Sequence, residues 1–453
     1  MYIGFSAYNH ESSAALIDKD GNLLNYYREE FLSRIKGDKS FPKKSIYKIF
    51  KENKIDIKDI TCVVFYERPL ASFLYPLKTA ALNIPKSLSL LSNQFRNFKR
   101  SSLSSFLDLA RLFPGLEQKL LYADHHLCHT LSALIYSDVK KNICSIIIDG
   151  FGDRSTASIH YIADSFNIKE LWNCEYPISI GLFYSSITDF LGFAINEGEY
   201  KVMGLAAYGN PNSKYAKLVS DLMSWDEKNN CLTAKMEYFD YHISTDNSFS
   251  KKMISILGEP RNPFEKLMPD NPNFQKYADI ARGAQDLTEK LLKQIFIYAK
   301  NITGSNIFCF SGGVALNSAS LKRIGSLPFV KKLVIPPSPG DAGAAIGASY
   351  YGFLKNQAQK DKIKTPTLFP CVIDFGEQIN LSSNIINNDF NILTKDKNKA
   401  LKICSELISK GQVIGSIISN AETGPRALGN RSLLCDGTNN EAVKILNSVI
   451  KSR

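Results

Sequence analysis

Short apolar runs that end in polar turns recur along most of the chain and predict buried strands. The first covers 2–7 and opens into a polar loop. After it, the stretches 14–18 and 23–30 flank the turn Lys19-Asp20-Gly21-Asn22, a pattern typical of a β-hairpin. A second strand pattern, 142–148, is likewise followed by two more, at 155–164 and 168–176. Because the same opening occurs twice, the sequence predicts an internal duplication.

Strand, polar loop and hairpin together are the opening of an actin-like or RNase H-like (ASKHA) lobe. We therefore predict an α/β fold with two duplicated lobes facing a shared cleft, within residues 1–352. Residues 70–120 hold seven basic and two acidic residues with interspersed phenylalanines. This favours a helical insertion with a solvated basic face over a nucleic-acid surface. Residues 353–374 are expected to form a linker, and 375–453 a short C-terminal domain.

The stretch 124–153 contains the strongest candidate chemistry. Asp124 is a good N-cap residue, and a helix is predicted from there to about Ser137. At roughly 100° per residue, the leucines of this helix form one stripe, whereas His125 and His129 lie together on the opposite side. We therefore expect the histidines outside the buried face. Imidazoles four residues apart can bind one metal ion, with exposed or hydrogen-bonded histidines as the alternative.

Two aspartates extend this candidate metal site. Asp149 follows a predicted buried strand, and a carboxylate beside two histidines would complete a mixed nitrogen and oxygen site that suits iron or zinc better than magnesium. Asp341 lies at a predicted loop tip before small residues that permit close helix packing, and it is a candidate fourth ligand. The competing interpretation of Asp149 is an ordinary turn residue.

Glycine-rich turns are candidate phosphate sites. Gly150 and Gly152 follow Asp149, and Gly312-Gly313 stand between a predicted strand and a helix start. Unhindered backbone amides at such positions favour an anion.

Two further loops carry charged residues. The loop 197–201 combines carboxylates with Lys201, and it either handles a polar ligand or is a surface turn. The loop 422–432 contains Arg426, Asn430 and Arg431, which suit a phosphate or carboxylate bound by two parallel hydrogen bonds.

The composition is that of an ordinary globular protein, with 44% hydrophobic and 22% charged residues. A formal net charge of +11 fits anionic small molecules, although general basicity is the favoured explanation. Nine cysteines without a CxxC pair favour a reducing cytosol over a disulfide framework or a zinc ribbon. Since the N-terminus lacks a secretory signal and no stretch approaches a membrane span, we expect a cytoplasmic protein with no membrane partner.

Six motifs, ordered along the whole chain, resemble the carbamoyltransferase family of nodulation and antibiotic-tailoring enzymes: DHHLCHTLSA, IIIDGFGD, NEGEYKVMGLAAYG, FSGGVALN, PSPGDAGAAIGA and TGPRALGNRS. The resemblance implies a larger unit similar to the tRNA threonylcarbamoyl transferase subunit, an actin-like fold with an iron-type metal site. It also implies a smaller YrdC-like α+β domain that makes carbamoyl-adenylate from carbamoyl phosphate and ATP. The implied cofactors are a divalent metal, Fe²⁺ with Zn²⁺ as the alternative, and Mg²⁺ accompanying ATP.

Position by position, the resemblance also implies roles for single residues. The metal ligands would be His125, His129, Asp149 and Asp341. The catalytic residues would be His10 and Lys201, with His10 as the general base in transfer, or alternatively as the cap of its turn, and Lys201 near the cleft. The nucleotide-contacting loops would be at Gly150, Gly152, Gly312, Gly313 and Asn317. The phosphate-handling residues of the smaller domain would be Arg426, Asn430, Arg431 and Ser432.

Two departures from the family pattern concern the smaller domain. Family members continue beyond the GPRALGNRS loop, whereas this chain stops at Arg453, and a segment that usually reads like FQGRMEFG is here IISNAETG. We therefore expect a partial YrdC-like domain.

The expected function is an ATP-dependent O-carbamoyltransferase acting on a small hydroxylated acceptor, such as a sugar or glycan precursor. Nucleic acid is not the expected partner, and a homodimer is compatible with the family. The alternatives are a threonylcarbamoyl-type tRNA-modifying enzyme and a nucleotide-binding protein without adenylate-forming activity.

Overall fold

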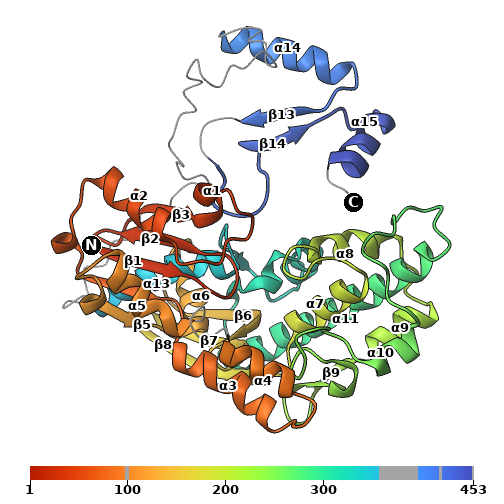
Figure 1. Cartoon of the computed structure of the whole chain (residues 1–453), viewed down its shortest axis with the longest axis horizontal. Helices are drawn as coiled ribbons and strands as arrows, with labels where there is room; N and C mark the ends of the chain where they lie inside the picture. Colours follow the sequence, from red (N-terminus) through yellow and green to blue (C-terminus); the bar gives the residue numbers. More distant parts are fainter. Residues whose placement is uncertain (97–101, 357–395, 418–420, 451–453) are drawn as a thin grey trace. The chain divides into compact units, whose positions relative to one another are not determined.

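The computed structural model describes residues 1–96, 102–356, 396–417 and 421–450. The chain divides into two compact units, Met1–Leu368 and Phe369–Arg453. The first unit contains two five-stranded sheets, which we call the first and the second lobe (Figure 1).

The two sheets have the same topology. The strand order is β3-β2-β1-β4-β5 in the first lobe and β8-β7-β6-β11-β12 in the second. In each lobe three strands pair antiparallel, and the central strand, β1 or β6, pairs parallel with the next. The predicted α/β class and internal duplication are confirmed. The strands are β1 Tyr2–Ser6, β2 Ser13–Ile17, β3 Leu23–Arg28, β4 Cys62–Phe65, β5 Leu120–Tyr122, β6 Ile143–Gly152, β7 Ser155–Asp164, β8 Asn167–Glu175, β11 Ile307–Ser311 and β12 Lys332–Val334.

Each lobe carries an insertion. In the first lobe the predicted helical insertion lies between β4 and β5, and in the second lobe an unpredicted one lies between α7 and α11. The first-lobe helices are α1 Glu29–Ser33, α2 Lys43–Asn53, α3 Pro69–Ala81, α4 Leu88–Arg96 and α5 Ser105–Leu112. The second-lobe elements are α7 Ile180–Phe190, α8 Glu199–Leu205, α9 Lys214–Ser220, β9 Met223–Asp226, β10 Cys231–Ala234, α10 Lys251–Leu257, α11 Phe274–Thr303 and α12 Ser318–Gly325.

Two helices cross between the lobes. Helix α6 (His125–Leu134) follows the first sheet in sequence but packs on β6 and β11, whereas α13 (Asp341–Lys355) follows the second sheet and packs on β1, β2 and β4. The two helices also pack on each other, and glycines permit the close approach. A Cβ atom at Gly347 would lie 1.8 Å from the carbonyl oxygen of Cys128, and one at Gly4 would lie 2.1 Å from that of Ala345. Residues of both lobes are thereby brought together.

The second unit contains α14 (Lys397–Ser409), the antiparallel strands β13 (Ile414–Ile417) and β14 (Arg431–Leu434), and α15 (Asn440–Lys444). The predicted linker begins too early, because residues 353–355 still belong to α13, where they continue the buried helix; residues 357–374 lie outside the described part of the chain. The YrdC-like character of this unit stays a prediction. Among the described residues, no helix has both the length and the apolar character needed to cross a bilayer.

Candidate metal centre

Helix α6 carries both histidines into the interior of the first unit. Its N-cap is Asp124, as predicted, with the carboxylate accepting a hydrogen bond from the Leu127 N–H at 2.9 Å. His125 and His129 are both 0% exposed, so the expectation that they lie outside the buried face is wrong. The physical reason is that α6 is buried between α13 and the second sheet, and a helix covered on several sides has no solvent-facing stripe.

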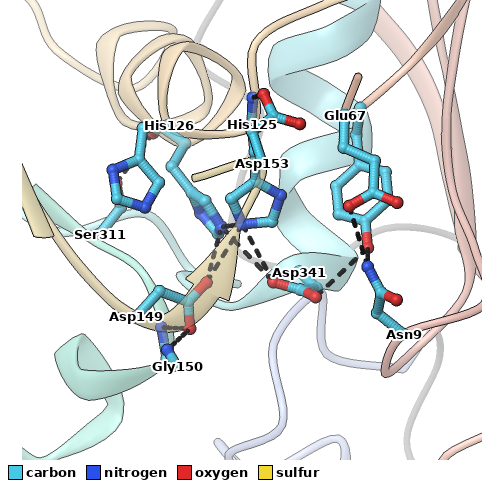
Figure 2. A network of polar contacts seen from close by, with 12 residues as sticks. Asn9, Glu67, His125, His126, Asp149, Gly150, Asp153, Ser311 and Asp341 are labelled. Carbon is cyan, nitrogen blue, oxygen red and sulfur yellow. Dashed lines mark hydrogen bonds and ion pairs between the residues drawn. The ribbon is translucent and has the colours of Figure 1, made fainter. Parts of the chain in front are cut away.

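Four side chains from three elements converge on one point (Figure 2). The Nε2 atoms of His125 and His129 are 3.2 Å apart, and they lie 3.3 and 3.2 Å from Oδ2 of Asp149. Oδ1 of Asp341 lies 3.7 and 3.5 Å from the same two nitrogens. All four donor atoms are within 4.8 Å of one another, so the structure brings the four predicted ligands together.

The donor set fits a divalent metal ion. Ligand bonds of about 2.0–2.2 Å place neighbouring donor atoms roughly 3.0–3.5 Å apart around one ion, which matches the spacing here. Two imidazole nitrogens that face each other need positive charge between them, and the two carboxylates balance that charge. Both histidine side chains are fully buried, whereas those of Asp149 and Asp341 keep 12% and 13% exposure. Ligands from solution can therefore approach on the aspartate side.

The same arrangement attracts protons. Burial disfavours the charged imidazole of His125, but the hydrogen bond to Asp149 and the charge of Asp341 outweigh burial and raise its pKa to about 10. Burial also disfavours the Asp149 carboxylate, yet hydrogen bonds from both histidines hold its pKa well below the usual range. The cluster thus stabilises positive charge at its centre.

Backbone groups fix Asp149. Its Oδ1 accepts hydrogen bonds from the N–H groups of Gly150 at 2.8 Å and Gly313 at 3.1 Å, which turns Oδ2 toward the histidines. Strand β6 extends through Gly152, so the expectation of a loop after Asp149 is wrong; its end pairs with β7 in a hairpin. A Cβ atom at Gly152 would lie 2.0 Å from Cδ2 of His125, so this glycine makes room for the imidazole ring. Contacts of Gly150 and Gly152 with a nucleotide stay a prediction.

Asp341 is the first residue of α13 and not a residue at a loop tip. An acidic side chain in the first turn of a helix is stabilised by the helix dipole. Gly312 has φ +91°, and its N–H donates to the carbonyl oxygen of Pro339 at 2.8 Å, which ties the end of β11 to the segment before Asp341.

Asn317 caps helix α12. Its Oδ1 accepts from the Ser320 N–H at 3.1 Å, and its side-chain amide exchanges two hydrogen bonds with that of Gln285, at 2.9 and 3.1 Å. These contacts give Asn317 a structural role. Its predicted contact with a nucleotide is untested.

His10 and Lys201 both approach the segment 193–196 of the second lobe. His10 Nε2 lies 3.3 Å from the carbonyl oxygen of Asn196, so the loop after β1 reaches across to the second lobe. Lys201 belongs to helix α8 and not to a loop as expected, and its Nζ lies 5.6 Å from the centre of the Phe193 ring. Their assigned roles in transfer and at the cleft stay predictions.

Sequence reasoning missed a set of polar residues around the centre: Asn9, Tyr66, Glu67, Arg68 and Asp153. Asp153, which is buried, accepts hydrogen bonds from the backbone N–H groups of His125 at 3.0 Å and Arg68 at 2.7 Å, and from Nε of Arg68 at 3.1 Å. Tyr66 and Glu67 directly follow β4. The residues after β1 and β4 could have been predicted as part of the site, because these parallel strands end at one edge of the first sheet just as β6 and β11 do in the second.

In the second unit, the loop 422–431 is folded around a carboxylate of its own. Oε1 of Glu422 accepts the backbone N–H groups of Leu428 at 2.7 Å, Asn430 at 3.0 Å and Arg431 at 3.3 Å. Arg431 and Ser432 belong to β14, and Ser432 Oγ accepts from the Gly429 N–H at 3.0 Å. In the structure these backbone amides therefore bind the Glu422 carboxylate. Phosphate handling stays a prediction for Arg426, Asn430, Arg431 and Ser432.

Two family models together match most of this chain. Residues 1–350 match the family model of the carbamoyltransferase N-terminus, and residues 405–453 match that of the carbamoyltransferase C-terminus. The chain belongs to the carbamoyltransferase family. The predicted resemblance is therefore confirmed over most of its length.

Two relatives show how far the similarity extends. Protein sll1178 of Synechocystis is 31% identical over 100% of this chain and 73% of its own length. Nodulation protein NolNO of Sinorhizobium fredii is 25% identical over 99% of this chain, which spans only 61% of the NolNO length. Among solved structures, component A of the (R)-2-hydroxyglutaryl-CoA dehydratase of Acidaminococcus fermentans aligns with 78% of this chain and 98% of its own, at 12% identity and a TM-score of 0.40.

Proposed function

We propose that the protein is an ATP-dependent O-carbamoyltransferase. It moves a carbamoyl group from carbamoyl phosphate, through carbamoyl-adenylate, to a hydroxyl group of a small acceptor such as a sugar or glycan precursor. The observation that carries this proposal is the convergence of two buried imidazoles and two carboxylates in a member of the carbamoyltransferase family.

The four ligands would hold a divalent ion, with iron and zinc as the candidates. When bound, such an ion acts as a Lewis acid on a carbamoyl or phosphate oxygen. His125 and His129 contribute neutral nitrogens from the buried side. Asp149 and Asp341 contribute negative charge and leave the solvent-accessible side for substrate.

Transfer needs a base for the acceptor hydroxyl, and His10 is our candidate. It would accept the hydroxyl proton while the hydroxyl oxygen bonds to the carbamoyl carbon and the bond from that carbon to the phosphate oxygen of the adenylate breaks. The products are the carbamoylated acceptor and AMP. The partial exposure of His10, on a loop that reaches the second lobe, is compatible with this role.

The proposal is tested with purified protein, ATP, carbamoyl phosphate and a panel of sugars. We expect release of AMP, of pyrophosphate from ATP and of inorganic phosphate from carbamoyl phosphate, and a carbamoylated sugar in the mass spectrum. The His129→Ala variant is expected to lose both bound metal and transfer.

His126→Ala is the matched control, because this buried imidazole lies on the same helix but contacts Ser158 Oγ at 2.8 Å and is not a ligand. It is expected to keep its metal. Absence of any carbamoylated product from the metal-loaded protein across the panel would contradict the proposal.

Two other outcomes identify the alternatives. Tight tRNA binding that weakens steeply with salt would indicate the tRNA-modifying enzyme. Nucleotide binding without pyrophosphate release would indicate a protein that lacks adenylate formation.

A further inference from the structure

We infer that Tyr66, oriented by Asn9 and Glu67, is a positioning residue that fixes the carboxylate of Asp341 from the opposite lobe. The inference rests on the proposed metal site. It adds three residues of the first lobe to that site and makes metal affinity depend on a contact between the lobes. Figure 2 shows two of them, Asn9 and Glu67, on the same side of the centre as Asp341.

Tyr66 contacts two of the four ligands. Its hydroxyl donates to Oδ2 of Asp341 at 3.4 Å, whereas Oδ1 of the same carboxylate faces the two imidazoles. The centre of its ring lies 5.1 Å from that of His125. The two oxygens of Asp341 thus have separate tasks, since one faces the centre and the other is held by Tyr66. The Tyr66 side chain is 0% exposed, so solvent cannot compete with this bond.

Asn9 gives the Tyr66 hydroxyl its direction. Nδ2 of Asn9 donates to the Tyr66 oxygen at 3.2 Å and to Oε2 of Glu67 at 2.9 Å. Because the phenolic oxygen already accepts this bond, its single hydrogen is available for Asp341. Glu67 is buried, and Ser72 Oγ also donates to its Oε2 at 2.9 Å. This carboxylate keeps the Asn9 amide nitrogen turned toward Tyr66.

The chain of hydrogen bonds crosses between the lobes. Asn9 follows β1 and Tyr66 follows β4, both in the first lobe, while Asp341 begins α13 after the second sheet. The Asp341 carboxylate keeps its orientation only while this contact exists. Loss of a side chain that hydrogen-bonds to a metal ligand typically weakens metal binding 10–100-fold.

The test is a titration of metal-free full-length protein with Zn²⁺ against a competing chelator. Tyr66→Phe keeps the ring and removes only the hydroxyl, and we expect zinc to bind it about 10–100-fold more weakly than the wild type. Asn9→Ala is expected to weaken zinc binding less. The double variant is expected to bind no more weakly than Tyr66→Phe alone, because Asn9 acts through Tyr66.

Tyr27→Phe is a matched control. This first-lobe tyrosine is also 0% exposed, its oxygen accepts from Asn25 Nδ2, and its hydroxyl donates to the carboxylate of Glu52, which is not a ligand. It is expected to bind zinc like the wild type. An unchanged dissociation constant in Tyr66→Phe, or equal weakening in both tyrosine variants, would overturn the inference. Failure of the proposed metal site looks different, because the wild type itself would then fail to bind zinc. Failure of the proposed function is distinct again, because metal-loaded wild type would then form no carbamoylated product.

Discussion

Gly152 lies directly against the imidazole ring of His125, and the centre of the Tyr66 ring lies 5.1 Å from the centre of that imidazole. The Nδ1 atoms of His125 and His129 are buried and have no hydrogen-bond partner within the described residues. Metal-binding histidines usually donate that N–H to a carboxylate or a carbonyl group. On the Nδ1 side of these rings, packing and not a hydrogen bond therefore limits their orientation.

Gly152→Ala is therefore expected to disturb the metal centre. The new methyl group would meet the His125 ring at 2.0 Å, and such overpacking costs about 1–3 kcal/mol of unfolding free energy and turns the ring away from its position. Metal content per protein, measured by mass spectrometry, should fall.

Gly204→Ala is the control for this substitution, because Gly204 is an exposed residue of helix α8 and a Cβ there meets nothing within 4 Å. It should keep full metal content. A Gly152→Ala protein with wild-type metal content would show that the ring is free to move.

Glu67 makes stability depend on pH. Burial raises its pKa from the usual 4.5 to about 7, so between these values the folded chain holds a proton that the unfolded chain has lost. The free energy of unfolding should then decline as pH rises through this interval, by on the order of 2–3 kcal/mol.

Urea unfolding of the metal-free protein between pH 4.5 and 8 measures this decline. In Glu67→Gln the side chain no longer titrates, so the decline attributable to it should disappear and the variant should gain stability relative to wild type toward pH 8. If the free energy of unfolding depends on pH in the same way in both proteins, Glu67 is not the group responsible for the decline.

At the scale of elements, the crossing of α6 and α13 decides where the site is. Each helix begins at the metal centre, with His125 and Asp341 as first residues, and each then packs on the sheet of the other lobe. Because Gly347 lets the helix axes approach, the two starting points come within ligand distance of each other. The site therefore depends on this helix crossing.

Gly347→Ala should weaken the crossing severely. Its Cβ would lie 1.8 Å from the Cys128 carbonyl oxygen, a backbone atom that cannot rotate away, and we expect a loss of about 3 kcal/mol or more in urea unfolding. Gly325→Ala, at the exposed end of α12 with nothing within 4 Å, should be neutral or gain up to about 1 kcal/mol. Equal stability of the two variants would show that the helices can shift apart cheaply.

At the scale of the whole molecule, the candidate metal centre lies within one of the two units. All four ligands and the polar residues around them belong to the first unit, and the loop around Glu422 belongs to the second. The chain spans less than two thirds of NolNO, so its relatives carry additional sequence. Metal binding can accordingly be assayed on the first unit by itself.

A fragment of residues 1–356 is expected to fold and to bind one equivalent of metal with the affinity of the full chain, because its two sheets and the crossing helices are complete. Metal titration and thermal unfolding of the fragment check this expectation. A fragment that unfolds cooperatively but binds no metal would show that the second unit contributes to the centre.

Much of this architecture could be predicted from local patterns. Apolar runs located most strands, the turn around Gly21 located the first hairpin, and the repeated opening predicted the duplication. The four candidate ligands could be named because histidines four residues apart on a helix and aspartates near predicted strand ends or loop tips are local signals, and because the family motifs include them.

The sequence alone determined most strands of the two sheets, that their pattern occurs twice, and which four residues are the candidate ligands, since these follow from patterns within a few residues. Only the tertiary structure decided that α6 is buried on several sides, that Gly152 belongs to a strand beneath His125, and that Asn9 and Tyr66 hold Asp341. The physical reason is that burial and hydrogen-bond partners depend on which elements pack together. Asp341 lies 275 residues from Tyr66 in sequence, and no local pattern carries that contact.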